Sequence, residues 1–424
     1  MSETLVPEST VPKEAKEAPL SPRFEIPRPE PSKVEKDPFQ FEREAQGERL
    51  ARLLEQNHLY YDQDKFKEQV EGDGRYLRID VVEPIVDESG TTIEMKQRFF
   101  KALLKQKDPE KDATTALAFK RQVAVQAFLD EKTSFPVTEL LSGNVEEANG
   151  EQWALYNWYQ KGEKGAVGFL HSQEEMKALT GEHASLAVKA IRALQNHQGD
   201  LPADVQAILV SLAPFQNFAG FQQDIAHILS RSVNGVGDYY TEDKKPFNEV
   251  IGQRLGTRDF ASQADQTIEK TRPIVESVQN RGVHIIHGDF APNNLFLGDG
   301  VTSDKLIALD FEWSGVSQNE ILAAVYDFGN LRARAWNNEA FRAGLDAAMI
   351  ESYAAEGREE VGRTIVALGI LRSHLNLAGF FENYVPEKSN LPEQTQRREE
   401  TEKDIAKAWG VLKMEKPAEI ARAA

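Results

Sequence analysis

The sequence of 424 residues contains no cysteine and no long hydrophobic run. Without cysteine, the protein can form no disulfide, thiolate nucleophile, cysteine-ligated iron–sulfur cluster or cysteine-type zinc site. The longest stretch without Asp, Glu, Lys or Arg covers residues 205–223, and it contains Pro214, Asn217 and several glutamines, which makes it a poor candidate for a membrane span. The first residues lack the basic and apolar regions of a signal peptide, so we expect a cytoplasmic protein without a membrane span.

Positive charge is also in short supply. The chain has 50 Lys and Arg residues against 68 Asp and Glu residues, which gives a formal net charge of −18 and a pI near 5.1. Nucleic-acid affinity depends largely on Lys and Arg side chains that neutralise phosphates, so this balance argues against a nucleic-acid partner. Cationic partners and metal-bound nucleotides fit it better.

Length and composition suggest how the chain is divided. A chain of this length exceeds what one hydrophobic core usually organises, so we expect two or three domains, or one fold with two lobes. Residues 1–40 hold eight of the nineteen prolines and few apolar residues, and they are expected to be a disordered tail. An N-terminal lobe with a leading helix is expected over 41–160, and a larger, mainly helical lobe over 161–424. The predicted fold class is α+β.

Hydrophobic periodicity places strands around one helix in the first lobe and helices through most of the second. The elements predicted for the first lobe are a helix over 41–69, a β-hairpin over 75–104, a helix over 112–131 and strands over 136–141 and 153–159. Asp112 is predicted to be the N-cap of the second of these helices. The helices predicted for the second lobe cover 173–197, 202–212, 223–232 and 260–281, and helical character resumes after about 319. Short apolar runs alternate with turn residues over 283–310, and the candidate chemistry is concentrated there.

The segment His287-Gly288-Asp289 is followed five positions after the aspartate by Asn294. Sixteen residues later an apolar run ends at Asp310, so a turn would bring this acid back beside the first loop. Phosphoryl transfer requires a carboxylate to orient or deprotonate the attacking hydroxyl, and an amide and a second carboxylate to hold Mg²⁺ on the nucleotide phosphates. Asp289, Asn294 and Asp310 match those three roles.

This motif, with Leu-Asp-Phe-Glu-Trp after it, resembles the aminoglycoside phosphotransferase and choline kinase superfamily, which has a protein-kinase-like fold. The resemblance covers about residues 76–375. It implies a bilobal fold with a small N-terminal nucleotide-binding lobe, built of an antiparallel sheet and one helix, and a larger catalytic and acceptor-binding lobe. It also implies that Asp289 is the catalytic residue, that Asn294 and Asp310 are Mg²⁺ ligands, and that His287 supports the loop.

The same resemblance implies nucleotide contacts in the first lobe. Lys101 is predicted to be the strand lysine that binds the nucleotide phosphates, with Lys105 as the alternative. Gln122 occupies the position where the superfamily most often has a glutamate that pairs with this lysine. This difference could weaken nucleotide positioning, or Lys101 could have another partner. The segment from Asn157 through Trp158 to Tyr159 is predicted to contact adenine.

Three further features bear on these assignments. There is no Gly-rich phosphate loop of G-x-G-x-x-G spacing in the first lobe. The string from Tyr326 to Gly329 spells the metal motif of protein kinases, but it lies in a helical pattern, so Asp327 is interpreted as structural. Glu312 has several readings, which are an acid supporting the site, a contact for a cationic substrate, and a surface or capping residue.

The predicted function is phosphoryl transfer from ATP or GTP, with Mg²⁺, to a hydroxyl of a small molecule. The superfamily suggests an aminoglycoside, a choline-like amino alcohol or a sugar, and the acidic surface favours a cationic acceptor. One alternative is a pseudokinase or nucleotide-binding scaffold, which Gln122 and the missing glycine loop motivate. The other is a protein kinase, but the chain has no long activation segment and no Ala-Pro-Glu anchor. Oligomeric state is left open.

Overall fold

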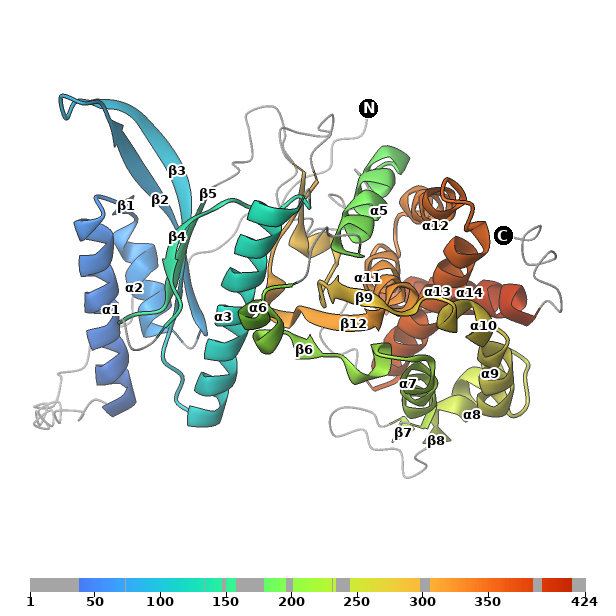
Figure 1. The fold of residues 1–424 in the computed structure, drawn as a ribbon. Coiled ribbons are helices and arrows are strands. Elements are labelled where there is room, and N and C mark those ends of the chain that lie inside the picture. The colour runs from blue at the N-terminus through green and yellow to red at the C-terminus, as the bar shows by residue number, and fades with distance from the viewer. Residues whose placement is uncertain are drawn as a thin grey trace, which may run out of the picture.

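The computed structural model divides the chain into two lobes that differ in secondary structure (Figure 1). The small lobe contains an antiparallel sheet with helices, and the large lobe is mostly helical, which confirms the predicted bilobal α+β class. The structure describes residues 38–72, 74–133, 135–146, 150–157, 179–195, 201–230, 232–233, 245–297, 306–383 and 391–413. Nearly all of the predicted disordered tail, together with Trp158 and Tyr159, lies outside these ranges.

The small lobe is built on a five-stranded antiparallel sheet in the order β1-β2-β3-β5-β4. The strands are β1 (Tyr60–Tyr61), β2 (Tyr76–Val86), β3 (Thr92–Leu103), β4 (Leu140–Asn144) and β5 (Trp153–Asn157). The predicted β-hairpin is therefore correct, and Arg78 of β2 lies opposite Lys101 of β3. The last two predicted strands are present: β4 begins later than the hydrophobic pattern indicates, whereas β5 begins at Trp153 as predicted, and the predicted end of that strand lies outside the described residues.

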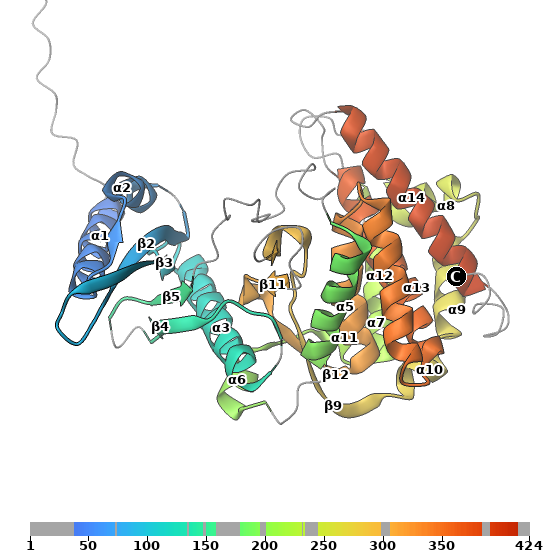
Figure 2. The same cartoon turned by 90° about the horizontal axis from the view of Figure 1, so that it is seen from above.

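Helices cover both faces of this sheet (Figures 1 and 2). On one face, α1 (Pro38–Gln56) and α2 (Gln63–Glu71) bury an apolar cluster that includes Leu54, Phe66 and Phe100. On the other face, α3 (Pro109–Lys132) packs Phe119 and Val123 against the sheet. The lobe therefore has three layers.

The prediction of a single helix over 41–69 is wrong, because the structure has two helices there. The chain leaves α1 and passes through a left-handed residue, His58 (φ 56°), to form β1. Asp62 then caps α2 by accepting hydrogen bonds from the backbone amides of Asp64 and Lys65. Two helices therefore replace one, because the intervening residues pair with β2.

The helix α3 also begins earlier than predicted. Its N-cap is Asp108, whose side chain accepts from the amides of Glu110 and Lys111, and Pro109 occupies the first turn, where its missing N–H costs nothing. Asp112 lies inside the helix and accepts a hydrogen bond from the backbone N–H of Gln106. The predicted cap is therefore wrong by one helical turn.

The large lobe combines helices with short strands. Its helices are α5 (Gly181–Gln195), α6 (Ala203–Ile208), α7 (Phe218–Ser230), α8 (Phe247–Arg254), α9 (Phe260–Glu269), α10 (Arg272–Glu276), α11 (Glu320–Arg334), α12 (Glu339–Ala354), α13 (Glu359–Asn383) and α14 (Leu391–Lys413). Its strands are β6 (Val210–Ser211), β7 (Ser232–Val233), β8 (Lys245–Pro246), β9 (Gln279–Ile286), β10 (Leu295–Leu297), β11 (Leu306–Ala308) and β12 (Gly315–Asn319). Sheets form in the order β6-β12-β9, from β10 with β11 and from β7 with β8.

Two of the predicted helices in this lobe are shorter than expected. The run over 260–281 divides into α9 and α10, with Pro273 in the first turn of α10, and the chain then enters β9. The run over 202–212 ends as a helix at Ile208, because the next residues form β6 beside β12. Phe215, Phe218 and Phe221 are buried in the core of this lobe.

The lobes are joined through the end of α3 and the strand that precedes Asp310. The backbone N–H of Ala308 donates to the carbonyl of Pro136, and Val137 forms a parallel bridge with Ala308. Arg121 of α3 donates to the backbone carbonyls of Ile208 and Glu312. The segment after β11 is thus fixed against the small lobe.

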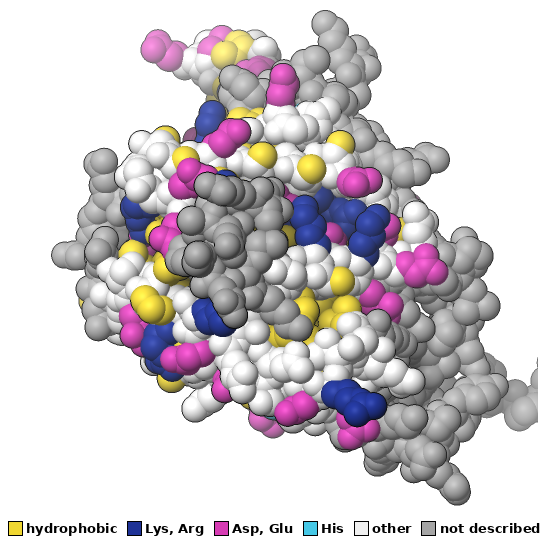
Figure 3. All heavy atoms as spheres, turned by 90° about the vertical axis from the view of Figure 1, so that its right-hand side faces the viewer, with side chains coloured by type: hydrophobic (Ala, Val, Ile, Leu, Met, Phe, Trp, Pro, Cys, Tyr) yellow, Lys and Arg dark blue, Asp and Glu magenta, His cyan; other side chains and the backbone are white. Residues whose placement is uncertain are grey.

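No helix among the described residues is long and apolar enough to cross a bilayer. Figure 3 shows the end of the large lobe, where acidic and basic side chains are interspersed with small apolar areas. This face therefore presents mixed charge, although the chain as a whole is acidic.

Candidate active site

The loop after β9 is held in a shape that only glycine permits at Gly288. Its φ is +86°, and a Cβ atom there would lie 2.1 Å from the backbone oxygen of Trp313. Any side chain would therefore be strained by backbone conformation and would also collide with a neighbouring segment. The tight contact brings the loop that carries Asp289 against the segment that follows Asp310.

His287 supports this loop from beneath. Its ring is fully buried, its Nδ1 accepts from the backbone N–H of Asp289 at 3.3 Å, and its Nε2 lies 3.0 Å from the carbonyl of Leu309. Because Nδ1 accepts, Nε2 carries the proton and donates to Leu309. Burial lowers the pKa of His287 to about 4, so the ring is neutral near pH 7.

Asp327 lies in α11, as predicted, and holds the same loop from the other side. Its carboxylate accepts from the backbone N–H groups of His287 at 2.8 Å and Gly288 at 3.2 Å. It is 1% exposed, and this burial raises its pKa to about 7. Its contacts are those of a loop support.

Asp289 and Asn294 come together as their spacing predicts. The Asn294 amide donates to the Asp289 carboxylate at 2.9 Å and to the Asp289 backbone carbonyl at 2.8 Å. The Asp289 side chain is 24% exposed, so it is accessible as well as oriented. Its second oxygen lies 3.0 Å from Nη2 of Arg334, at the C-terminal end of α11.

Asp310 lies beside this pair, although the chain between β10 and β11 separates them in sequence. The backbone N–H of Leu309 donates to the carbonyl of Asn294 at 2.9 Å, which aligns the end of β11 with the loop. Asp310 itself has a φ of +65°, an uncommon conformation for a residue with a side chain and one that is concentrated at functional sites. Its side chain is one-third exposed.

Lys101 is almost completely buried, with 3% of its surface exposed. Its ammonium lies 2.8 Å from Glu312 Oε1, 2.5 Å from Gln122 Oε1 and 3.5 Å from Asp310 Oδ1. It also lies 4.2 Å from the centroid of the Tyr76 ring. Burial lowers the pKa of Lys101, and the carboxylates of Asp310 and Glu312 oppose that shift.

The lysine therefore has an acidic partner, but not in the helix where the superfamily usually supplies it. Glu312 lies in the 3-10 helix η4 (Phe311–Trp313) and is 2% exposed, so its reading as a surface residue is wrong. Gln122 contributes a neutral acceptor from α3, as its amide permits. With Gln122 in place of a glutamate, Lys101 therefore has another acidic partner, Glu312, as one of the two expectations stated.

The other predicted nucleotide residues are less involved. Lys105 is partly exposed and pairs with Asp112 at 3.0 Å, outside the Lys101 cluster. The Asn157 side chain contacts Arg98 at 2.6 Å and Glu139 at 3.0 Å, and its backbone N–H donates to the Glu139 carbonyl. The amide of Asn157 is thus already engaged.

Two participants were missed from the sequence. Arg334 carries no recognisable motif, and only its position seven residues after Asp327 on a helix could have placed it near the loop. Tyr76 begins β2 and gave no signal beyond its strand propensity.

The donor set suits a magnesium ion bound together with phosphates. Asn294 and Asp310 supply an amide oxygen and a carboxylate oxygen, which are the hard ligands Mg²⁺ prefers, and Mg²⁺ is usually bound by one or two carboxylates plus substrate phosphates. Within the described ranges, no three His, Cys, Asp or Glu side chains converge as they would in a closed metal site. Any metal here would therefore need further ligands from water or from a bound molecule.

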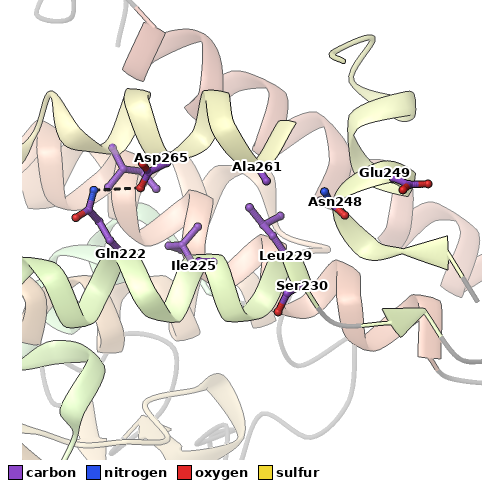
Figure 4. Close-up of a pocket in the computed structure, with 10 residues that line it drawn as sticks. Gln222, Ile225, Leu229, Ser230, Asn248, Glu249, Ala261 and Asp265 are labelled. Carbon is purple, nitrogen blue, oxygen red and sulfur yellow. Dashed lines mark hydrogen bonds between the residues drawn. The ribbon is translucent and has the colours of Figure 1, made fainter. Parts of the chain in front are cut away.

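A separate cavity of about 390 Å³ lies among α7, α8 and α9 (Figure 4). Ile225, Leu229 and Ala261 line it, and Gln222 is hydrogen-bonded to Asp265 across one end. None of the predicted site residues lines this cavity. It gives no reason to move the candidate site from the loop after β9.

No protein-family model matches the chain, and no curated protein matches its sequence. Among solved structures, an ethanolamine kinase from Plasmodium vivax is 12% identical with a TM-score of 0.42, over 82% of this chain and 81% of that chain. An aminoglycoside phosphotransferase from Alicyclobacillus acidocaldarius is 13% identical with a TM-score of 0.43, over 83% and 90%. A choline kinase from Cryptosporidium parvum is 11% identical with a TM-score of 0.42, over 86% and 94%. The names of these three proteins are those of the superfamily that the sequence motifs resemble.

Proposed function

We propose that the protein is a Mg²⁺-dependent phosphotransferase that moves the γ-phosphoryl group of ATP or GTP to a hydroxyl of a small molecule. The observation that carries this proposal is the 3.5 Å contact between Lys101 of the small lobe and Asp310 of the large lobe. The hydrogen bonds from Leu309 to Asn294 and from Asn294 to Asp289 extend this contact to the accessible carboxylate, which supports a single site. A buried cation, two candidate metal ligands and an accessible carboxylate are the groups that phosphoryl transfer requires.

In this proposal Lys101 binds the nucleotide phosphates. Glu312 fixes the ammonium in the absence of a glutamate at position 122, and Tyr76 and Gln122 limit its movement. A bound Mg²⁺ would neutralise charge on the leaving nucleotide, with Asn294 and Asp310 as its protein ligands. The superfamily resemblance and the donor chemistry support these roles.

Asp289 acts on the acceptor. Its carboxylate orients the attacking hydroxyl and accepts its proton, while the hydroxyl oxygen forms a bond to the γ-phosphorus and the bond between that phosphorus and the β,γ-bridging oxygen breaks. The nucleoside diphosphate leaves with the electron pair of that bond. His287 and Asp327 keep the loop rigid, which limits the reorganisation needed before reaction.

One of the two observations that favoured a non-catalytic nucleotide-binding scaffold no longer supports it. Lys101 has a carboxylate partner in Glu312, so Gln122 does not leave it without one. The second observation stands, since the sequence of the first lobe contains no G-x-G-x-x-G spacing. Turnover separates these two functions directly.

The test is acceptor-dependent formation of ADP from Mg²⁺–ATP, measured across a broad panel of small alcohols and sugars. Asp289→Asn should lower kcat by about 10²-fold to 10⁴-fold, the usual contribution of a positioned acid or base. Asp265→Asn, in the separate cavity, is the matched control and should keep its activity. Equal turnover in the wild type and Asp289→Asn would refute the proposal, and nucleotide binding without any turnover would favour the scaffold.

A further inference from the structure

Arg334 is a charged residue beside Asp289, and no role above explains it. Its guanidinium lies 3.0 Å from Asp289 Oδ1, and its side chain is 45% exposed. It comes from the last turn of α11, whereas Asp327 near the middle of the same helix supports the loop from beneath. The helix thus contributes to the loop twice, once by a buried acid and once by an exposed base.

One face of α11 is more exposed to solvent than the rest of the helix. From Ile321 to Ala333 the residues of α11 are buried, except Tyr326 and Asn330, and Arg334 follows at the same spacing of four. Residues four apart lie on one face of a helix, so these three side chains form a single stripe. The stripe ends at Asp289 and carries a phenol, an amide and a guanidinium.

The charges around the stripe are paired with one another. The Arg372 guanidinium lies 5.2 Å from the Tyr326 ring centroid, and Arg372 is paired with Asp224 at 2.9 Å. Tyr326 itself packs edge-on against Phe215 at 4.8 Å. Each of these partners is fixed and mostly buried, so Arg334 is the member of the group that can turn towards a ligand.

We propose that Arg334 recognises an anionic group, a carboxylate or a phosphate, on the acceptor whose hydroxyl binds at Asp289. This inference rests on the proposed function and narrows its substrate class. An acceptor hydroxyl must reach the carboxylate that Arg334 now contacts, so the guanidinium would exchange one anion for another. Its planar fork matches carboxylate and phosphate oxygens, whereas an ammonium group at the same place would meet a like charge. The acidic net charge of the chain favours a cationic acceptor, but the exposed guanidinium of Arg334 beside Asp289 favours an anionic group at that point.

The test compares acceptors that differ only in charge at one carbon. Glycerate and glycerol phosphate are the anionic probes, glycerol is neutral, and aminopropanediol is cationic, each assayed with the full chain and Mg²⁺–ATP. The wild type should use the anionic probes with the highest kcat/KM. Arg334→Gln should raise their KM by about tenfold or more, as expected for the loss of a charge-assisted contact, and leave the KM for glycerol within about threefold.

Arg334→Glu should favour aminopropanediol, and Arg334→Lys should keep part of the preference for anions, since it retains the charge without the fork. The control is Arg272→Gln, a partly exposed arginine paired with Glu269 and Glu276 outside the site, which should change none of these ratios. A wild-type preference for the cationic probe, or an equal loss for all probes in Arg334→Gln, would overturn the inference but leave the phosphotransferase standing.

The absence of Asp289-dependent turnover with every probe would count against the proposed function. Calorimetric titration of glycerate and glycerol phosphate into the wild type and Arg334→Gln would still test the inference. Binding that is lost in the variant supports it, and binding that is equal in both proteins, or undetectable in both, contradicts it.

Discussion

The two halves of the proposed site hold their charges in opposite ways. Around Lys101 the ammonium, Gln122 and Glu312 are each at most 5% exposed, and the cluster draws on β3, α3 and η4. Around Asp289 the carboxylate and Arg334 are open to solvent, and the cluster draws on one loop and one helix end. The first cluster is closed and fixed, and the second is open and exchangeable.

This contrast fits a division of labour. A buried ion pair is costly to break, so it can hold a lysine in one position while a nucleotide is bound and released. A partly exposed ion pair contributes little to stability, so either partner can be replaced by a substrate group. The closed half therefore suits a nucleotide that is the same in every turnover, and the open half suits the acceptor.

The largest expected effect comes from removing the acid of the closed cluster. Glu312→Ala should lower the free energy of unfolding by about 3–5 kcal/mol, because Lys101 is left buried without its nearest carboxylate. Glu146→Ala is the matched control, since Glu146 pairs with Lys120 at 2.5 Å in the same lobe but both side chains are more than one-third exposed, and it should cost about 1 kcal/mol or less. Denaturant titration measures both, and equal losses would show that the Lys101 cluster is not closed.

A second prediction concerns the loop that connects the halves. The pKa of His287 is lowered from 6.5 to about 4, so its contribution to stability is present above pH 6.5 and is lost as the pH falls through about 4. The pKa of Asp327 is raised from 3.8 to about 7, so its contribution is present below pH 3.8 and is lost as the pH rises through about 7. In the wild type, the two groups therefore change the free energy of unfolding with pH in opposite directions.

Single substitutions should separate these slopes. In Asp327→Asn the stability should rise by up to about 3 kcal/mol from pH 4 to 6.5, and in His287→Gln it should fall by up to about 4 kcal/mol from pH 4 to 7. Gln can keep the donor to the Leu309 carbonyl. Denaturant titrations across this range give the slopes, and slopes of the same sign in both variants would contradict the assignment.

A third prediction concerns how Glu312 and position 122 act together on Lys101 in nucleotide binding. Glu312→Gln should weaken binding of Mg²⁺–ATP, and adding Gln122→Glu in the same chain should restore part of it, because the acid then approaches Lys101 from α3. The coupling expected for residues that share one partner is about 0.5–3 kcal/mol. Calorimetry of the wild type, both single variants and the double variant completes the cycle, and additive effects would mean that the two positions do not share Lys101.

The smallest expected effect belongs to the open half. Arg334→Gln should change the free energy of unfolding by about 1 kcal/mol or less, since its ion pair with Asp289 is partly solvated. The same variant should change acceptor preference, so stability and specificity respond separately. A loss of stability comparable to that of Glu312→Ala would place Arg334 among the structural residues.

The loop that carries Asp289 was more predictable from sequence than the ion pairs on either side of it, because its residues are close together in the chain. Asp289 and Asn294 lie five positions apart in one loop, and the apolar strand before Asp310 marks where the third residue falls. Lys101 could be predicted from the resemblance, but its pairing with Glu312 joins positions 211 residues apart and depends on how the lobes meet. Arg334 depends on where a helix ends against a loop.

Local signals failed where two of them competed. Both Asp108 and Asp112 could cap a helix, and Pro109 favours the earlier one by fitting the first turn. The helical pattern over 41–69 continues across His58 although the chain turns there, since periodicity does not register pairing with a strand. The bilobal fold class and the contact between Asp289 and Asn294 were predicted correctly, because several independent signals agreed on each.

The division between the halves is tested most directly by the affinity of Mg²⁺–ATP for Asp289→Asn and Glu312→Gln, measured by calorimetry beside the wild type. The account predicts that Asp289→Asn binds the nucleotide within about threefold of the wild type, whereas Glu312→Gln binds it about tenfold or more weakly. Nucleotide affinity that falls equally in both variants, or falls only in Asp289→Asn, would contradict it.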